Sequence, residues 1–89
     1  MNQTKTLLID AVERLKDDNF EVGPNWNSCH DLCQSNEGVP DYDWVHGFVH
    51  LIEGDKSNAS YWYRRAEKTQ TCQELEPEWQ SILNELKQE

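Results

Sequence analysis

The fold is decided by residues 43–68, DWVHGFVHLIEGDKSNASYWYRRAEK. This stretch holds two of the three histidines, two of the four tryptophans and two of the three tyrosines of the 89-residue chain. Its first half is apolar around most of a helix circumference, which is typical of a central, buried helix. Its second half carries a single apolar stripe at helical spacing, formed by Ala59, Trp62, Tyr63 and Ala66.

A tight turn is expected at Gly54-Asp55, in the middle of this stretch. Glycine suits the left-handed position that ends a helix, and aspartate is a strong N-cap. We therefore predict a helix from Asp41 or Asp43 to Glu53 and another from Asp55 to about Lys68. Gly47 lowers the helix propensity of the first of these by about 1 kcal/mol relative to alanine. We expect that another helix crosses closely there.

The remainder of the chain predicts three more helices. Leu8, Val12 and Leu15 share one face of a segment from Thr4 to Asp18, after which Phe20 and Val22 are expected to fold back onto the core. A second helix should follow the Gly23-Pro24 break and run from Trp26 to Ser35, with Asn25 or Asn27 as its cap. Pro77 suits the first turn of a last helix, whose apolar residues are Leu75, Trp79, Ile82, Leu83 and Leu86.

Composition limits the classes of function. The mean hydropathy is −0.93 and the formal net charge is −9, but nine aromatic side chains, four of them tryptophan, supply enough apolar area for a folded core. We predict one domain over residues 1–89, an all-α bundle of about five helices around the central hairpin. The acidic balance disfavours nucleic acid and anionic membranes as partners. The three cysteines and the absence of a signal-peptide pattern predict a cytoplasmic protein.

Two resemblances can be read from the same residues. The large and small residues Trp44, Gly47, Phe48 and Leu51, followed by Ala59, Tyr63 and Ala66, resemble a tetratricopeptide-type helical hairpin, which implies a TPR-like packing of the two helices. Residues 26–66 also resemble a family of small uncharacterised helical proteins, through His30-Asp31-x-x-Gln34, Trp44-Val45-His46, His50, Glu53-Gly54-Asp55, Asn58-Ala59 and Tyr61-Trp62-Tyr63-Arg64-Arg65. This second resemblance implies which residues could form a site and implies no activity.

A candidate site follows from the histidine spacing. His46 and His50 lie one helical turn apart, and Glu53 comes three residues later on the same side. Imidazole and carboxylate groups are suitable ligands for zinc or another divalent metal. We therefore consider His46, His50 and Glu53 as metal ligands, with His30 joining from the preceding helix. The alternative is a structural network in which these polar groups hydrogen-bond one another.

Other polar residues near the turn have two interpretations each. Asp55 and Asn58 either complete a ligand site or form an N-cap with its first turn. Arg65 (or Arg64) either binds an anion or reaches back to Glu53 or Asp55 as an ion pair. The candidate ligand-binding cluster is therefore His30, His46, His50, Glu53, Asp55, Asn58 and Arg65. Cys29 and Cys33 could also hold a metal with Cys72 or a histidine, although buried cysteines more often act as small apolar residues.

No catalytic signature accompanies these residues: the sequence has no G-x-S-x-G, P-loop, glycine-rich dinucleotide turn or H-E-x-x-H motif. We predict a non-enzymatic module that binds a protein partner or forms a homodimer, without a required cofactor. The alternative function is a metal-binding or small-ligand-binding site, catalytic or not, built on His30, His46, His50 and Glu53.

Overall fold

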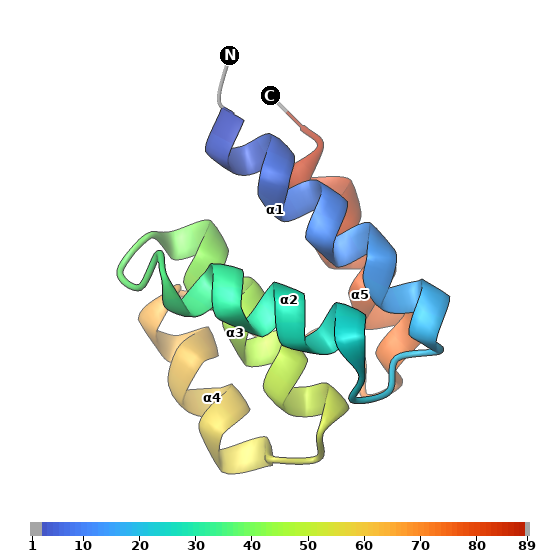
Figure 1. Ribbon diagram of the computed structural model, residues 1–89. Coiled ribbons are helices and arrows are strands. Elements are labelled where there is room, and N and C mark those ends of the chain that lie inside the picture. The colour runs from blue at the N-terminus through green and yellow to red at the C-terminus, as the bar shows by residue number, and fades with distance from the viewer. Residues whose placement is uncertain (1–2, 89) are drawn as a thin grey trace.

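Five α-helices make up the described part of the chain, residues 3–88 of a computed structural model (Figure 1). No described residue lies in a strand, which confirms the predicted all-α bundle. The helices are α1 (Gln3–Arg14), α2 (Pro24–Gln34), α3 (Pro40–Ile52), α4 (Lys56–Arg65) and α5 (Leu75–Leu86), and a 3-10 turn, η1 (Leu15–Asp18), extends α1. None of the described helices has the length and apolar character that a bilayer span requires.

Helix α3 is the centre of the fold, as its apolar circumference predicted. Every residue from Tyr42 to His50 is buried, and α3 packs against α1, α2, α4 and α5. Helix α4 folds back along α3, while α1 and α5 lie side by side and run in opposite directions (Figure 1). The Trp79 Nε1–H donates to the Val12 carbonyl at 2.7 Å, which ties α5 to α1. The arrangement places the α3–α4 hairpin and α2 on one side, where the histidines lie.

The two helices of the hairpin approach closely at Gly47. A Cβ atom at this position would lie 2.3 Å from the Tyr63 Cδ1 atom and 3.0 Å from the Ala59 carbonyl oxygen. Only a residue without a side chain fits there, which confirms the expected close crossing and explains a glycine inside a helix. Whether the hairpin belongs to the tetratricopeptide type stays a prediction.

The turn between α3 and α4 forms as the sequence predicted. Gly54 adopts a positive φ of 86°, and the Asp55 carboxylate accepts a hydrogen bond from the Asn58 amide at 3.2 Å. Helix α4 is shorter than expected, however, because it ends at Arg65 rather than near Lys68. Glu67 enters the left-handed region, and the Lys68 amide closes the end on the Tyr63 carbonyl.

Helix starts differ from the predicted caps. Gly23 is the N-cap of α2, and neither Asn25 nor Asn27 caps it through a side chain. Instead, the Asp18 carboxylate from the preceding turn accepts a hydrogen bond from the Asn25 amide. Val39 is the N-cap of α3 and makes no side-chain capping bond, so neither Asp41 nor Asp43 is the N-cap residue. The Asp43 carboxylate instead accepts a hydrogen bond from the Gly38 amide, which fixes the loop before the helix.

The segment after α1 follows the prediction at Phe20 and departs from it at Val22. Phe20 folds back and packs edge-on against Phe48 and Trp79, with ring centroids 6.5 and 5.5 Å apart. Val22 is 57% exposed, so its expected place in the core was wrong. Asn19 and Phe20 both take positive φ values, and this sharp turn directs only the first of the two apolar residues inward.

A buried carboxylate holds the linker between α4 and α5. Glu78 is 2% exposed and accepts hydrogen bonds from the Tyr63 hydroxyl, the Thr71 amide and hydroxyl, and the Cys72 amide, at 2.8 to 3.0 Å. This hydrogen-bonded, buried Tyr63 has a pKa raised well above its usual value, first by burial and then by the bond to Glu78. Burial of Glu78 is therefore compensated by four donors.

Candidate metal centre

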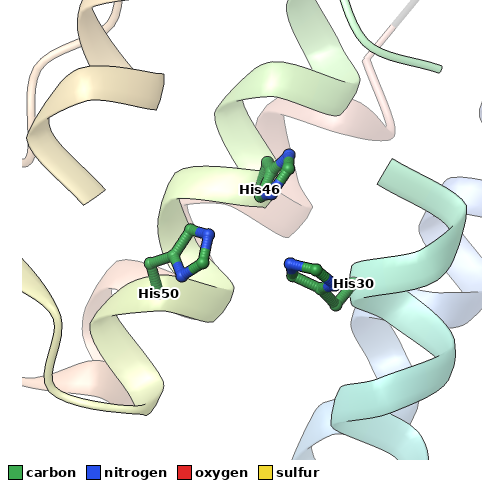
Figure 2. Close-up of side chains that lie close together, drawn as sticks. All are labelled: His30, His46 and His50. Atoms are coloured by element: carbon green, nitrogen blue, oxygen red, sulfur yellow. The ribbon is translucent and has the colours of Figure 1, made fainter. Parts of the chain in front are cut away.

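All three histidines of the chain converge on one place (Figure 2). His30 comes from α2, and His46 and His50 come from successive turns of α3. One ring nitrogen of each lies within 4.8 Å of the others. Figure 2 shows the three rings around a common space between the two helices. The structure therefore places His30 beside His46 and His50, as the sequence suggested.

Tryptophan rings hold two of the imidazoles in place. His30 stacks on Trp26 with ring centroids 5.0 Å apart and an interplanar angle of 8°. The Trp26 Nε1–H donates to the Val49 carbonyl at 2.7 Å, which fixes this indole between α2 and α3. His46 stacks on Trp62 of α4, with centroids 3.9 Å apart. Stacking on a tryptophan therefore fixes the orientation of the His30 and His46 rings, in addition to the contacts that the imidazoles make with one another.

His46 is the innermost of the three side chains. It is 2% exposed, and its Nδ1 atom is buried without a hydrogen-bond partner among the described residues. Burial, followed by the nearby imidazoles of His30 and His50 and then by Arg65, lowers the pKa of His46 to about 4. The ring is neutral near pH 7 and keeps a lone pair, as a metal ligand must.

His50 uses its two nitrogens on different sides. Its Nδ1 atom lies 2.6 Å from the Glu53 Oε2 atom, whereas the opposite edge of the ring faces His30 and His46 (Figure 2). A carboxylate at Nδ1 favours the tautomer with the proton on Nδ1 and leaves Nε2 as an acceptor. Metal-bound histidines in proteins commonly have this outer carboxylate, which fixes the ring and increases its basicity.

Glu53 lies outside the imidazole cluster. The predicted ligands His46, His50 and Glu53 do not form a single group of close ligand atoms. His50 lies between His46 and Glu53 and belongs to two such groups. One group is His30, His46 and His50; the other is His50, Glu53 and Asp55, again with candidate ligand atoms within 4.8 Å. The first group is largely buried, while Glu53 and Asp55 are exposed.

Asn58 and Arg65 have other contacts. The Asn58 amide completes the Asp55 cap, which is the capping interpretation of that pair. Arg65 lies over the Trp62 ring at 4.9 Å, and its Nε atom is 3.9 Å from the buried Asp43 carboxylate. The described ion pairs include none between Arg65 and Glu53 or Asp55, so the predicted partner was wrong.

The cysteines take no part in a metal group among the described residues. Cys29 and Cys33 are fully buried in the core. A hydrogen bond with Cys29, and then burial, raises the pKa of the Cys33 thiol well above its usual value. A neutral, buried thiol is a poor nucleophile and a poor metal ligand. Cys72 lies in the linker, where its amide bonds to Glu78.

Comparisons of the chain with known protein families, with curated proteins and with solved structures found no match. The function is therefore argued from the geometry of the site. Three converging imidazoles, an outer carboxylate at His50 and an aromatic frame are chemically suited to hold a divalent transition metal ion.

Proposed function

We propose that this protein binds a divalent transition metal ion through His30, His46 and His50, with zinc as the reference ion. The observation that carries the proposal is the convergence of every histidine in the chain on one buried place between α2 and α3. Glu53 bonds to His50 and the Asp31 carboxylate lies 3.9 Å from His30, but His46 between them has no acid partner among the described ion pairs. Three imidazoles this close repel one another when protonated, so mutual ion pairing does not account for their convergence.

The spacing of the nitrogens supports the proposal. Tetrahedral zinc with Zn–N bonds of about 2.0–2.1 Å places its ligand nitrogens about 3.3 Å from one another. The three histidine nitrogens lie within 4.8 Å, so the greatest separation has to shorten by at most about 1.5 Å. His30 is the one ligand on α2, and its side chain is 21% exposed, so it has the most room to move.

The polar atoms of the cluster also favour an ion. An unpartnered buried nitrogen such as His46 Nδ1 costs about 1–3 kcal/mol. A metal ion bound at Nδ1 would supply the missing partner. The hydrogen bond from His50 to Glu53 would persist, because it uses the nitrogen that faces away from the other two rings.

The number of ligands indicates an exchangeable position. Structural zinc sites are closed by four protein ligands, whereas three protein ligands leave the fourth position to water or to a bound molecule. We therefore propose an open metal-binding site and assign no catalytic residue. Binding to a protein partner or to a second copy stays a prediction. Among the residues whose burial is described, the exposed large hydrophobic side chains are Leu7, Val22, Val39 and Tyr61, and they belong to four separate segments.

The experiment is a calorimetric zinc titration of protein without a histidine tag, in physiological salt with millimolar Mg²⁺ to occupy surface carboxylates. We expect one Zn²⁺ per chain. At a free zinc concentration 100 times Kd, the stabilisation is about 2.7 kcal/mol, which raises Tm by roughly 10–20 °C.

The informative variant is His30→Gln, because His30 is the least buried ligand and its loss leaves α3 intact. We expect it to weaken zinc binding by at least about 100-fold, since even outer partners of a ligand contribute 10–100-fold. Asn27→Gln, on the exposed face of the same helix, is the matched control and should bind zinc as the wild type does. Equal zinc affinity in all three proteins would refute the proposal.

A further inference from the structure

Helix α2 receives little support from its own sequence. Leu32 and Gln34 are the strong helix formers among its 11 residues. It has neither an acidic side chain in its first turn nor a basic one in its last turn to complement its dipole, whereas each of the other four α-helices has at least one of these. Its N-cap, Gly23, supplies no side-chain hydrogen bond. Helix α2 therefore depends on tertiary contacts to stay helical.

The tertiary contacts that hold α2 are also few. Three of its residues are buried, against nine in α3 and five in α5, and two of the three are cysteines, which behave as small hydrophobic side chains. Helix α4 also buries three residues, but two of these are aromatic and its N-cap bonds through a side chain. Hydrogen bonds tie α2 to its surroundings from Trp26 to the Val49 carbonyl and from the Asn25 amide to the Asp18 carboxylate.

The other helices have contacts with one another that do not involve α2. Helix α3 packs against α1, α4 and α5, and the hydrogen bond from Trp79 to the Val12 carbonyl joins α5 to α1. Loops precede and follow α2, at residues 19–23 and 35–39, and link it to η1 and α3 (Figure 1). An element with weak local support and few buried contacts can open as a unit while the remaining helices stay folded.

The proposed metal ligands are divided unequally between α2 and α3. His46 and His50 lie on successive turns of α3 and are more than nine-tenths buried, so they stay together when α2 moves. His30 comes from α2 (Figure 2), its side chain is 21% exposed, and its Nδ1 atom lies 3.9 Å from the exposed Asp31 carboxylate. His30 is therefore at the solvent edge of the cluster and separates from the other two imidazoles whenever α2 opens.

We infer that the bound metal ion regulates the order of α2. Without metal, α2 opens and closes as a local unit, and an ion bound to all three imidazoles clamps it to α3. This inference rests on the proposed metal-binding function. By linkage, saturating zinc lowers the opening constant of α2 by the ratio of the zinc affinities of the closed and open forms. If the loss of His30 weakens binding about 100-fold or more, opening becomes about 50- to 100-fold rarer at free zinc of 100 times Kd.

The test is native-state hydrogen exchange of the untagged protein, read by mass spectrometry of peptic peptides, in chelator-treated protein and at free zinc of 100 times Kd. In the metal-free protein, residues 27–34 of α2 should exchange at least about tenfold faster than residues 79–86 of α5. Zinc should slow exchange in α2 by about 50- to 100-fold. In His30→Gln it should change the α2 rates by less than about threefold, whereas Asn27→Gln, on the exposed face of the same helix, should respond as the wild type does.

Two results would overturn the regulation of α2. Equal exchange of the α2 and α5 peptides in metal-free protein would mean that α2 opens only when the whole chain unfolds. Zinc that binds in the calorimetric titration and leaves the α2 rates unchanged would mean that the ion does not hold α2 in place. Both results leave the metal-binding site standing, whereas a wild type that binds no zinc refutes the proposed function itself.

Discussion

Replacing Gly47 by alanine tests the helix crossing that positions the site. The added Cβ would lie 2.3 Å from Tyr63 Cδ1 and 2.7 Å from Cε1. Carbon atoms in ordinary contact are about 3.5–4.0 Å apart, so the ring must move by about 1.2 Å or more. Tyr63 is 5% exposed, and its hydroxyl is bonded to Glu78 at 2.8 Å, so it cannot swing freely.

Two opposing effects decide whether Gly47→Ala raises or lowers the free energy of unfolding. Overpacking of a core costs about 1–3 kcal/mol, and displacement of the ring weakens a charge-assisted hydrogen bond whose full loss costs about 1.5–3 kcal/mol. Alanine recovers about 1 kcal/mol of helix propensity. The clash should prevail, and we expect Gly47→Ala to lower the free energy of unfolding by about 2 kcal/mol.

The assay is urea unfolding followed by tryptophan fluorescence and far-UV circular dichroism. Ser60→Ala adds helix propensity at an exposed position of α4 and should be neutral or stabilising by about 0.5 kcal/mol. If Gly47→Ala were as stable as the wild type, or more so, the two helices would not cross as closely as described, and the reasoning would be refuted.

Three further predictions concern Glu78, His46 and the cysteines. Glu78→Ala leaves four donors without their buried acceptor and should destabilise the fold by about 3 kcal/mol in urea; a loss below about 1 kcal/mol would mean that water replaces the carboxylate freely. His46 has a folded pKa of about 4, below its ordinary value of 6.5, so the unfolded chain binds its proton first. In the metal-free protein, the contribution of neutral His46 to the free energy of unfolding should be fully present above pH 6.5 and should fall by up to about 3 kcal/mol as the pH drops to 4. The loss of stability with falling pH should be smaller in His46→Gln. An equal pH dependence of stability in both proteins would contradict the lowered pKa of His46. Of the three thiols, the partly exposed Cys72 should react quickly with a disulfide reagent, and the buried Cys29 and Cys33 only at the rate of unfolding; three equal rates would place the two helix cysteines at the surface.

The central hairpin could be predicted because its signals are local. Gly54 and Asp55 are adjacent residues with known turn and cap preferences, and the apolar circumference of α3 requires burial whatever its neighbours are. Gly47 was informative for the same reason, since a glycine inside a helix needs a close contact to explain it.

Other features depend on tertiary contacts that helical spacing does not contain. Glu78 reads as a surface acid in the first turn of α5, and only the packing of the linker brings its donors together. The signal that could have found it is weak: Tyr63 needs a partner for its buried hydroxyl. Val22 follows a turn with two positive φ values, which no apolar pattern indicates.

The sequence predicted that His30 could join His46 and His50, and the three do lie together, but it did not predict how the polar residues divide into two groups. The i, i+4, i+7 spacing put His46, His50 and Glu53 on one side of the helix, and this is correct. Spacing cannot tell which ring nitrogen faces which neighbour. Because His50 turns Nδ1 toward Glu53 and its other edge toward His30, the three residues serve two groups instead of one.

The most direct test of the proposed metal centre is X-ray absorption spectroscopy at the zinc edge of the loaded protein. We predict three imidazole nitrogens at about 2.0–2.1 Å, with one light atom from water at the fourth position. Coordination by a sulfur at about 2.3 Å, or by oxygens without the scattering pattern of imidazole, would contradict the proposed centre.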